Sequence, residues 1–442
     1  MKTNRKLTLL QTIALSVGTM IGASIFSIFG VGVKVAGYNL PFAFILSGIY
    51  AMMVGYSYAN LGTEIVSNAG PIAFIEKAIG GGATTGTLSI LMWLSYVTSI
   101  ALFAISFSGY FLPLMGIHNT SSQTFIIVGI ISLFGALNFF GGSHAVGKFE
   151  FWIVLTKIFI LLIFIIAGFT VFHPEYLSFN FSPKGIEGIL NASVIFFLSY
   201  MGFGLITNAS ENIENPKKTV PKAIYISIVV VLTIYILVSL SALGAVPVYK
   251  IIKYEENALA IAAEPALGKL GFVLLSFGAL ISISSALNAT LYSGANAAYA
   301  LMKKGYIPTP AKQLKREWMS EHFGLYLTCS LSLIFSLFFN VTSVASIISL
   351  ITTSIYIFVL YSHLKLIEDK KVPGKKGLVF FNLMVITFVA IEILKYQFSV
   401  DSKTFFISIG IFLACFLVET FYYGKFRKIS IFKKFKFPLN IP

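Results

Sequence analysis

The chain has 442 residues, of which 57% are hydrophobic and only 11% are charged, and its mean hydropathy is +0.87. Soluble domains carry about 25% charged residues, so this composition excludes a soluble protein and predicts an all-α protein that crosses a membrane many times. The net charge of +15 does not indicate nucleic-acid binding, because the basic residues gather in particular loops. The two cysteines lie in separate apolar runs and indicate neither a disulfide nor a metal site.

Hydropathy, together with the charged or Pro/Gly-rich breaks between apolar runs, predicts twelve membrane-spanning helices. In chain order their approximate ranges are 8–34, 41–66, 84–111, 122–140, 146–172, 187–212, 221–245, 269–302, 323–340, 343–366, 377–398 and 403–424. The N-terminal segment is short and basic but has no small-residue cleavage site, so we expect the first helix to be retained and not removed as a signal peptide.

Lysine and arginine are divided unequally between the two sides of the predicted membrane. With the N-terminus inside, 24 of the 32 fall in cytoplasmic segments and 7 in outer segments, and Lys157 alone falls within a helix. Because basic residues favour the cytoplasmic side, we expect a multi-pass protein of the cell membrane with both termini in the cytoplasm. The basic excess is then mainly a signal of topology, and contact of the Lys-rich tail with anionic lipid is a secondary expectation.

The first predicted helix carries no charge over residues 7–33 and has small residues at its centre. As one straight helix these residues would span about 40 Å at 1.5 Å per residue, which exceeds a hydrocarbon core of about 30 Å. The central run at 18–26 reads GTMIGASIF, where a plain membrane anchor would carry Leu and Ile. The sixth predicted helix has a similar run, SYMGFG, at 199–204.

These two small-residue clusters predict interrupted helices. Backbone leaves a helix at membrane depth only where protein or a watery cavity satisfies the freed N–H and C=O groups. Two interruptions at corresponding places in two halves of a chain indicate the binding site of a transporter. The alternative is that the glycines only allow helices to pack closely. For one segment alone the two interpretations are about equal, and the paired placement favours interruption.

The first ten predicted helices form two blocks of five with opposite topology, and each block opens with an interrupted helix. This is the inverted-repeat arrangement of the leucine-transporter (LeuT) type of fold, with helices 11 and 12 outside the repeat. The predicted divisions are a first repeat at 1–175, a second repeat at 176–370, helices 11 and 12 at 371–426 and a basic cytoplasmic tail at 427–442.

A helix broken at mid-membrane would expose main-chain groups that suit a zwitterion. N–H groups freed around Ala23 and Ser24 would carry partial positive charge and form an anion site for a carboxylate. Carbonyl groups freed around Leu198, Ser199 and Met201 would accept hydrogen bonds from an ammonium group. Such a site needs no buried acid or base, and the sequence places none in helix 1 or at the centre of helix 6.

Both clusters resemble signatures of the amino acid–polyamine–organocation (APC) superfamily. The likeness rests on residues 18–26 of helix 1 and on residues 196–203 of helix 6, which are followed by ENIENPKK at 211–218 and by Pro221. It extends over nearly the whole chain, and the nearest likeness is to archaeal proton-coupled amino-acid transporters of broad specificity.

The resemblance implies that main-chain groups of six residues bind the substrate. These are Met20, Ala23 and Ser24 for the carboxylate, and Leu198, Ser199 and Met201 for the amino group. Relatives that carry cationic amino acids often have an acid where this chain has Gly204, so its absence favours neutral substrates. Many relatives also have an aromatic gate where this chain has Leu198.

Lys157 is the strongest candidate for a role in proton coupling. It lies nine residues, or about 13 Å along a helix, beyond Lys148, which is too deep for its side chain to reach the membrane interface. A charged lysine in hydrocarbon is costly, so we expect it to face protein. Because desolvation disfavours the charged form, such an amine is suited to taking up and releasing a proton. The alternative is a permanently charged, structural lysine that is bonded to carbonyls.

The resemblance also implies partners for this amine. In sodium-coupled proteins of this type of fold a cation lies between helices 1, 5 and 8, and the Lys157 ammonium would occupy that place. Its expected partners are the Gly18 carbonyl and a hydroxyl of helix 8, Ser282 first and Ser285 next.

Other polar and aromatic residues are weaker candidates. Tyr96 and Trp93 are expected either to wall a pocket or simply to pack, and Asn208 and Asn288 to form helix–helix hydrogen bonds. The outer segment 247–265 contains a short amphipathic stretch that is either a lid over the outer vestibule or a solvated connector.

Together these features predict a secondary active transporter, a proton symporter of neutral L-amino acids that works by alternating access. The alternative within this class is an amino-acid exchanger without net proton movement, and sodium symport is disfavoured because Lys157 would repel a second cation. A channel would need a carbonyl filter such as TVGYG, and an enzyme would need clustered His, Asp, Cys or Glu at depth. Neither pattern occurs. No cofactor is predicted, and the expected partners are an amino acid, protons and the lipid bilayer.

Overall fold

The computed structural model describes residues 6–426 apart from 68, 118–119, 142–149 and 305–316, and its elements are helices throughout this part of the chain. The α-helices are α1 (Leu9–Ala36), α2 (Leu40–Glu64), α3 (Pro71–Ile79), α4 (Ala83–Leu114), α5 (Thr120–Gly141), α6 (Glu150–Thr170), α7 (Pro183–Phe196), α8 (Gly202–Asn208), α9 (Pro216–Ala245), α10 (Val248–Lys253), α11 (Ala258–Lys304), α12 (Glu317–Phe338), α13 (Val341–Glu368), α14 (Lys376–Val400) and α15 (Ser402–Phe426). The 3₁₀ helices are η1 (Gly37–Asn39), η3 (Pro174–Tyr176), η4 (Phe197–Tyr200), η5 (Ser210–Asn212) and η6 (Glu255–Asn257).

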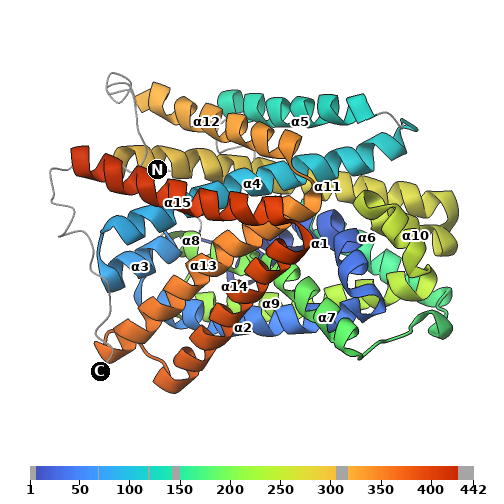
Figure 1. The fold of residues 1–442 in the computed structure, drawn as a ribbon, viewed down its shortest axis with the longest axis horizontal. Helices are drawn as coiled ribbons and strands as arrows, with labels where there is room; N and C mark the ends of the chain where they lie inside the picture. The colour runs from blue at the N-terminus through green and yellow to red at the C-terminus, as the bar shows by residue number, and fades with distance from the viewer. Residues whose placement is uncertain (1–5, 68, 118–119, 142–149, 305–316, 427–442) are drawn as a thin grey trace.

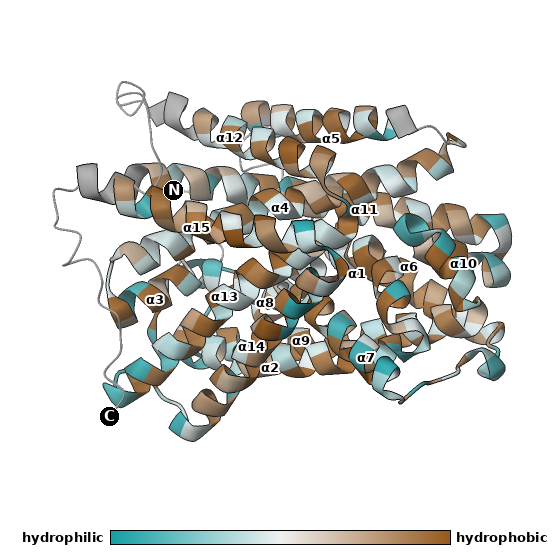
Figure 2. Cartoon of the chain, viewed as in Figure 1, coloured by the Kyte–Doolittle hydropathy of each residue, from teal (hydrophilic) through white to brown (hydrophobic). Residues whose placement is uncertain are grey.

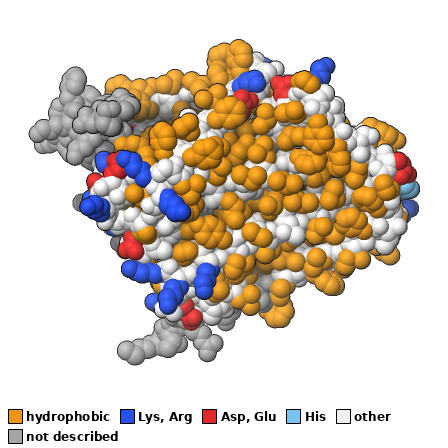
Figure 3. Space-filling model, turned by 90° about the horizontal axis from the view of Figure 1, so that it is seen from below, with side chains coloured by type: hydrophobic (Ala, Val, Ile, Leu, Met, Phe, Trp, Pro, Cys, Tyr) orange, Lys and Arg blue, Asp and Glu red, His pale blue; other side chains and the backbone are white. Residues whose placement is uncertain are grey.

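Most of the long helices run roughly along the longest axis of the molecule, with the short helix α3 at one end and α10 at the other (Figure 1). Along these helices hydrophobic residues dominate, and hydrophilic residues are most frequent near helix ends and in loops (Figure 2). Apolar side chains cover the middle of the face in Figure 3, whereas the Lys and Arg side chains visible there gather mainly at its left end. Many apolar side chains of the described residues are well exposed, such as Phe140 at 84% and Phe338 at 79%. A broad apolar surface with charged ends is the pattern of a polytopic membrane protein.

The number of membrane spans is not fixed at twelve by the structure. Ten stretches of described residues are long and apolar enough to cross a membrane. One of them, Ser24–Glu64, joins the second part of α1 to α2, and two shorter apolar stretches, Leu9–Gly22 and Phe323–Phe338, fall below the required length. The predicted count of twelve, the LeuT topology and the division into repeats therefore stay predictions.

The predicted helix boundaries agree with the structure to within a few residues in most places. The first predicted helix, 8–34, corresponds to α1, Leu9–Ala36. This helix begins with a capping box, in which the Thr8 side chain accepts from the Gln11 N–H and the Gln11 side chain accepts from the Thr8 N–H. The predicted helix at 269–302 begins directly after Gly268, whose φ of +61° bends α11. Before this bend, residues 258–263 are buried, so this part of the outer segment 247–265 is not a solvated connector.

The prediction of an interrupted helix 1 is wrong. In the structure α1 is one continuous α-helix through its small-residue cluster. The physical reason is that the small residues allow neighbouring helices to approach closely, as the alternative interpretation held. The predicted anion site at Ala23 and Ser24 is therefore not formed in this structure, because it would require their N–H groups to be released from the hydrogen bonds of α1.

The interruption predicted in helix 6 is present, although the chain does not unwind there. The α-helix α7 ends at Phe196, the chain continues as the 3₁₀ helix η4, and α-helical structure resumes with α8 at Gly202. Met201 N donates to Leu198 O (3.1 Å) and Gly204 N donates to Met201 O (3.0 Å), which are the i to i+3 bonds of a tighter helix. A 3₁₀ stretch inside a long helix often marks a hinge.

The chain before α1 is joined to the chain after α8. Leu7 N donates to Asn212 O (2.7 Å), and Glu214 N donates to Leu7 O (2.9 Å), so Leu7 and Ile213 form a parallel β-bridge. The two small-residue clusters therefore belong to helices that are tied together at one end.

Candidate functional site

Four carbonyl groups of α1 accept hydrogen bonds from the side chains of four other helices. The pairs are Lys157 Nζ to Gly18 O (2.7 Å), Tyr235 OH to Met20 O (2.6 Å), Ser282 Oγ to Gly22 O, and Tyr110 OH to Phe26 O (3.0 Å). The donors come from α6, α9, α11 and α4. Because a carbonyl oxygen has two lone pairs, it can accept such a bond while α1 stays helical. The small-residue cluster is thus a point at which several helices converge.

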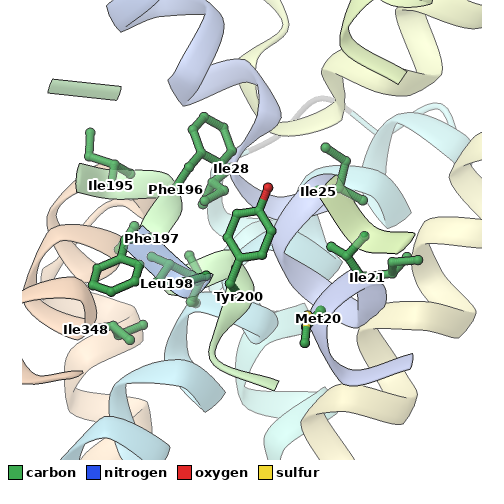
Figure 4. Packing of buried hydrophobic residues seen from close by; sticks show 14 of the residues in the cluster. Met20, Ile21, Ile25, Ile28, Ile195, Phe196, Phe197, Leu198, Tyr200 and Ile348 are labelled. Atoms are coloured by element: carbon green, nitrogen blue, oxygen red, sulfur yellow. The ribbon is translucent and has the colours of Figure 1, made fainter. Parts of the chain in front are cut away.

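Tyr235 connects α1 to the interruption between α7 and α8. Its buried hydroxyl lies 2.6 Å from Met20 O and 3.4 Å from Ser199 O, so that it bridges a carbonyl of each helix. The Ser199 hydroxyl is itself enclosed and has no hydrogen-bond partner among the described residues, which leaves it available to a ligand. In the view of Figure 4, Tyr200 of η4 lies between Leu198 on one side and Met20 and Ile21 of α1 on the other, within the buried core.

Two glycines explain how closely α1 is packed. A Cβ on Gly202 would lie 2.8 Å from Met20 N and 2.9 Å from Ser16 O, so the start of α8 rests directly on the backbone of α1. A Cβ on Gly18 would lie 2.2 Å from Val154 Cγ2 of α6. Any larger residue at either position would push the helices apart.

Lys157 is 1% exposed and lies on α6 with its ammonium group against α1. Besides donating to Gly18 O, Nζ lies 3.4 Å from the position that a Cβ on Gly22 would occupy. The structure therefore brings Lys157 and Gly18 together as expected. Ser282 lies close by, but its hydroxyl donates to Gly22 O, one turn of α1 further along. Whether these residues take part in proton coupling stays a prediction.

A cavity of about 150 Å³ opens beside these groups. Of the residues predicted to bind substrate or proton, it is lined by Gly18, Met20, Ser24, Lys157, Leu198, Ser199 and Met201. Ser282 and Ser285 do not line it, and the side chain of Ala23 lies outside the described part of the structure. The cavity thus gathers the main-chain groups of α1 and η4 around one small space with a buried amine at its wall.

Nothing in the described part of the chain is arranged as a metal centre, because no group of three or more His, Cys, Asp or Glu side chains is close enough together there. The polar residues that line the cavity instead supply main-chain groups, hydroxyls, the Asn208 amide and one amine. Such a set can bind a small zwitterion through hydrogen bonds.

Comparison with known proteins identifies the family. The sequence profile of the amino acid permease family matches residues 7–425. The chain belongs to the amino acid permease family. It is 53% identical over 428 residues to the uncharacterized protein MJ0609 of Methanocaldococcus jannaschii, with 97% of this chain and 96% of that protein covered.

Two other relatives are more distant. The chain is 31% identical over 373 residues to the inner membrane transport protein YbaT of Escherichia coli, with 83% of this chain and 85% of YbaT covered. It is 23% identical over 348 residues to the serine/threonine exchanger SteT of Bacillus subtilis, with 75% and 77% covered. The resemblance to APC transporters that the two clusters indicated is thereby confirmed.

The cavity of this permease also contains residues that the sequence analysis did not single out. Tyr58 of α2 and Thr352 and Tyr356 of α13 line it. The hydroxyl of Thr352 donates to Met201 Sδ (3.3 Å), which ties α13 to the helix 6 interruption. The one local signal was the polar run TTS at 352–354, in a helix that carries further serines along its length.

The weaker candidates divide between lining the cavity and packing. Tyr96 lines it, whereas Trp93 is buried and donates to Thr328 Oγ1 (3.1 Å) of α12. Asn288 makes a helix–helix bond as expected, accepting from Asn138 Nδ2 (2.8 Å). Asn208 lines the cavity as well as donating weakly to Tyr96 OH (3.5 Å).

Proposed function

We propose that this permease is a secondary active transporter that carries neutral L-amino acids together with protons by alternating access. The observation that carries the proposal is the buried Lys157 amine, 1% exposed, which donates to the Gly18 carbonyl at the wall of the cavity. An ionisable residue within a membrane span is costly to keep and usually serves function.

The amine offers a way to couple protonation to the position of α1. When protonated, Lys157 makes a charge-assisted hydrogen bond to Gly18 O, which is stronger than a neutral one. When the proton leaves, the bond weakens and α1 is held less firmly to α6. Protonation thereby favours the conformation with α1 packed against α6, and proton release favours the other conformation.

The substrate would bind between α1 and the η4 interruption. Its amino group would donate to the carbonyls of Leu198, Ser199 and Met201, and its carboxylate would lie against Met20 and Ser24 of α1, which line the same cavity. Gly204 adds no acid to this cavity, which supports a neutral side chain on the substrate. SteT, a relative named as a serine/threonine exchanger, supports the same substrate class.

The name of SteT also favours one alternative, amino-acid exchange without net proton movement. An exchanger returns only when loaded, so it would not accumulate substrate on a proton gradient alone. We further propose that the protein lies in the cell membrane with both termini in the cytoplasm, which is supported by the 24 Lys and Arg residues in the predicted cytoplasmic segments against 7 outside.

The test uses the purified full-length protein in liposomes and a panel of labelled amino acids under separate proton and sodium gradients. We expect a neutral amino acid to accumulate on the proton gradient and not on the sodium gradient. Lys157→Ala should abolish this accumulation and retain exchange of internal for external substrate. Thr156→Ala is the matched control, because Thr156 is exposed on the same helix and bonds only to Trp152 O (2.9 Å).

Undiminished proton-driven accumulation by Lys157→Ala would contradict the role of the amine. Exchange by the wild-type protein without accumulation on any gradient would establish the exchanger instead. Accumulation on the sodium gradient would overturn proton coupling.

A further inference from the structure

A second cavity lies at the α10 end of the molecule, which is the end opposite α3 (Figure 1). Its volume is about 370 Å³. It is enclosed by the ends of α1 and α4, by α10 and η6, and by the turn before α13. In the proposed orientation this end faces the outside.

A contact between α1 and α4 lies close to the outer cavity. Tyr110 OH donates to Phe26 O (3.0 Å), and the two rings meet edge to face at 6.3 Å. Along α1, Ser24 lines the inner cavity, Phe26 makes this contact, and Lys34 lines the outer cavity. Along α4, Phe103 lines the inner cavity and Gly109 the outer one.

The outer cavity is lined by charged side chains of both signs. Lys34 and Glu255 pair with each other, Nζ to Oε2, at 2.9 Å. Lys253 and Glu256 have no ion pair within the described part of the chain. The Lys253 ammonium stands over the Tyr254 ring at 5.4 Å, and Glu256 Oε1 accepts only a long bond from Gln123 Nε2 (3.4 Å). One positive and one negative group thus stay available in the same cavity.

Two glycines hold the acidic residues in place. A Cβ on Gly30 of α1 would lie 2.1 Å from Glu255 O, and a Cβ on Gly109 of α4 would lie 2.6 Å from both Cβ and Oε2 of Glu256. The η6 turn therefore fits between α1 and α4 only because both positions lack a side chain. The two glycines thus place η6, and with it the side chain of Glu256, against α1 and α4.

We propose that this outer cavity is a second binding site for the transported amino acid, in which Glu256 binds the ammonium group and Lys253 the carboxylate. These two groups are common to every α-amino acid, so the site would capture substrates without distinguishing their side chains. The chemistry differs from that of the inner cavity, where main-chain groups would bind the zwitterion. The inference rests on the proposed function, since it requires that amino acids be the substrate.

The site would supply substrate to the inner cavity from one side only, and this asymmetry makes it testable. Transport of a neutral amino acid would be measured from the α10 side in intact cells and from the opposite side in inverted vesicles made from the same cells. Lys253→Met and Glu256→Gln should each raise KM about three- to tenfold from the α10 side. Each variant removes one charged partner of the substrate, and solvent reduces the contribution of such a partner to the binding free energy. KM from the opposite side should not change.

Charge reversal separates binding from folding. Lys253→Glu and Glu256→Lys alone should each raise KM from the α10 side, and the double variant, which restores one charge of each sign, should recover most of the loss. Lys250→Met, an exposed α10 lysine that does not line the cavity, is the matched control and should have no effect.

An equal rise of KM from both sides would overturn the inference, as would unchanged KM values in both single variants or a double reversal that recovers nothing. None of these results would contradict the proposal that the protein transports amino acids. Wild-type protein that carries no amino acid at all would instead defeat the proposed function.

Discussion

The two small-residue clusters look alike in sequence but have different structures. The cluster in α1 stays within a continuous α-helix, whereas the one between α7 and α8 becomes the 3₁₀ helix η4. The α1 cluster is surrounded by donors from four helices that bond to its carbonyls without displacing the helical bonds. Small residues therefore permit a helix to be interrupted, and whether the interruption forms depends on the hydrogen-bond donors that surround them.

The comparison also shows how the two clusters depend on each other. Gly202 of α8 rests on the backbone of α1 at Ser16 and Met20, and Tyr235 donates to a carbonyl in both. A movement of one helix must therefore be followed by the other or must break these contacts. We expect the 3₁₀ segment to be the hinge and α1 to be the element that it holds or releases.

The largest effect is expected at the contact between the two clusters, from Gly202→Ala. Its Cβ would lie within 2.9 Å of backbone atoms of α1, which cannot yield as a side chain can. Overpacking of this kind costs about 1–3 kcal/mol, so we expect transport to fall by about tenfold or more. The measurement is initial uptake per folded protein, with folding followed by size-exclusion chromatography.

Gly129→Ala, in α5, is the control. Its Cβ would meet nothing within 4 Å and the residue does not line the cavity, so uptake should stay within about twofold of wild type. Equal losses in both variants would show that the effect of Gly202→Ala does not come from its contact with α1. Normal uptake by Gly202→Ala would show that the close contact between α8 and α1 is not required.

The sequence predicted the helices well and the state of α1 poorly, for different physical reasons. Helix ends follow from local features, such as the Thr8 cap and the bend at Gly268, and apolar length follows from composition. The depth of Lys157 was equally readable, because a charge inside an apolar run must face protein. Its approach to Gly18 O followed from the family resemblance.

Whether a helix is interrupted at its glycine cluster depends on contacts between segments far apart in the chain. The donors Tyr110, Tyr235 and Ser282 lie 84, 215 and 260 residues from the carbonyls that they reach in α1. No local pattern marks the two tyrosines among the 21 in the chain, and Ser282 was expected only from the family resemblance, as a partner of Lys157. The same applies to Tyr356, which lines the cavity from a helix that the sequence presented as a plain span.

A smaller effect is expected from Tyr235→Phe, which removes the hydroxyl that bridges Met20 O and Ser199 O. Loss of a buried hydrogen bond costs about 1–2 kcal/mol, and here the loss falls on both sides of the substrate cavity. We expect KM to rise about fivefold and thermal stability to fall slightly, measured by uptake and by thermal unfolding in detergent.

Tyr200→Phe tests whether the rise in KM is specific to the hydroxyl of Tyr235. Tyr200 is equally buried, but its hydroxyl donates to Phe44 O (3.1 Å) and not to α1. It should lower stability by a similar amount and leave KM unchanged. A rise in KM for both variants would mean that any buried tyrosine hydroxyl supports the cavity, and the bridge between the two clusters would lose its special role.

The smallest effect is expected from Ser282→Ala, which removes a single donor from the α1 cluster, at Gly22 O. If side-chain donors keep α1 continuous, then losing one worth about 1 kcal/mol should increase local opening about fivefold. Hydrogen–deuterium exchange should therefore accelerate in peptides covering α1 and stay unchanged in those covering α7 and α8. Ser293→Ala is the control, because that hydroxyl bonds only to Ala289 O (2.8 Å) of its own helix. Unchanged exchange in α1 would show that the helix is continuous by its own backbone bonds, and the difference between the two clusters would then have to arise within each helix.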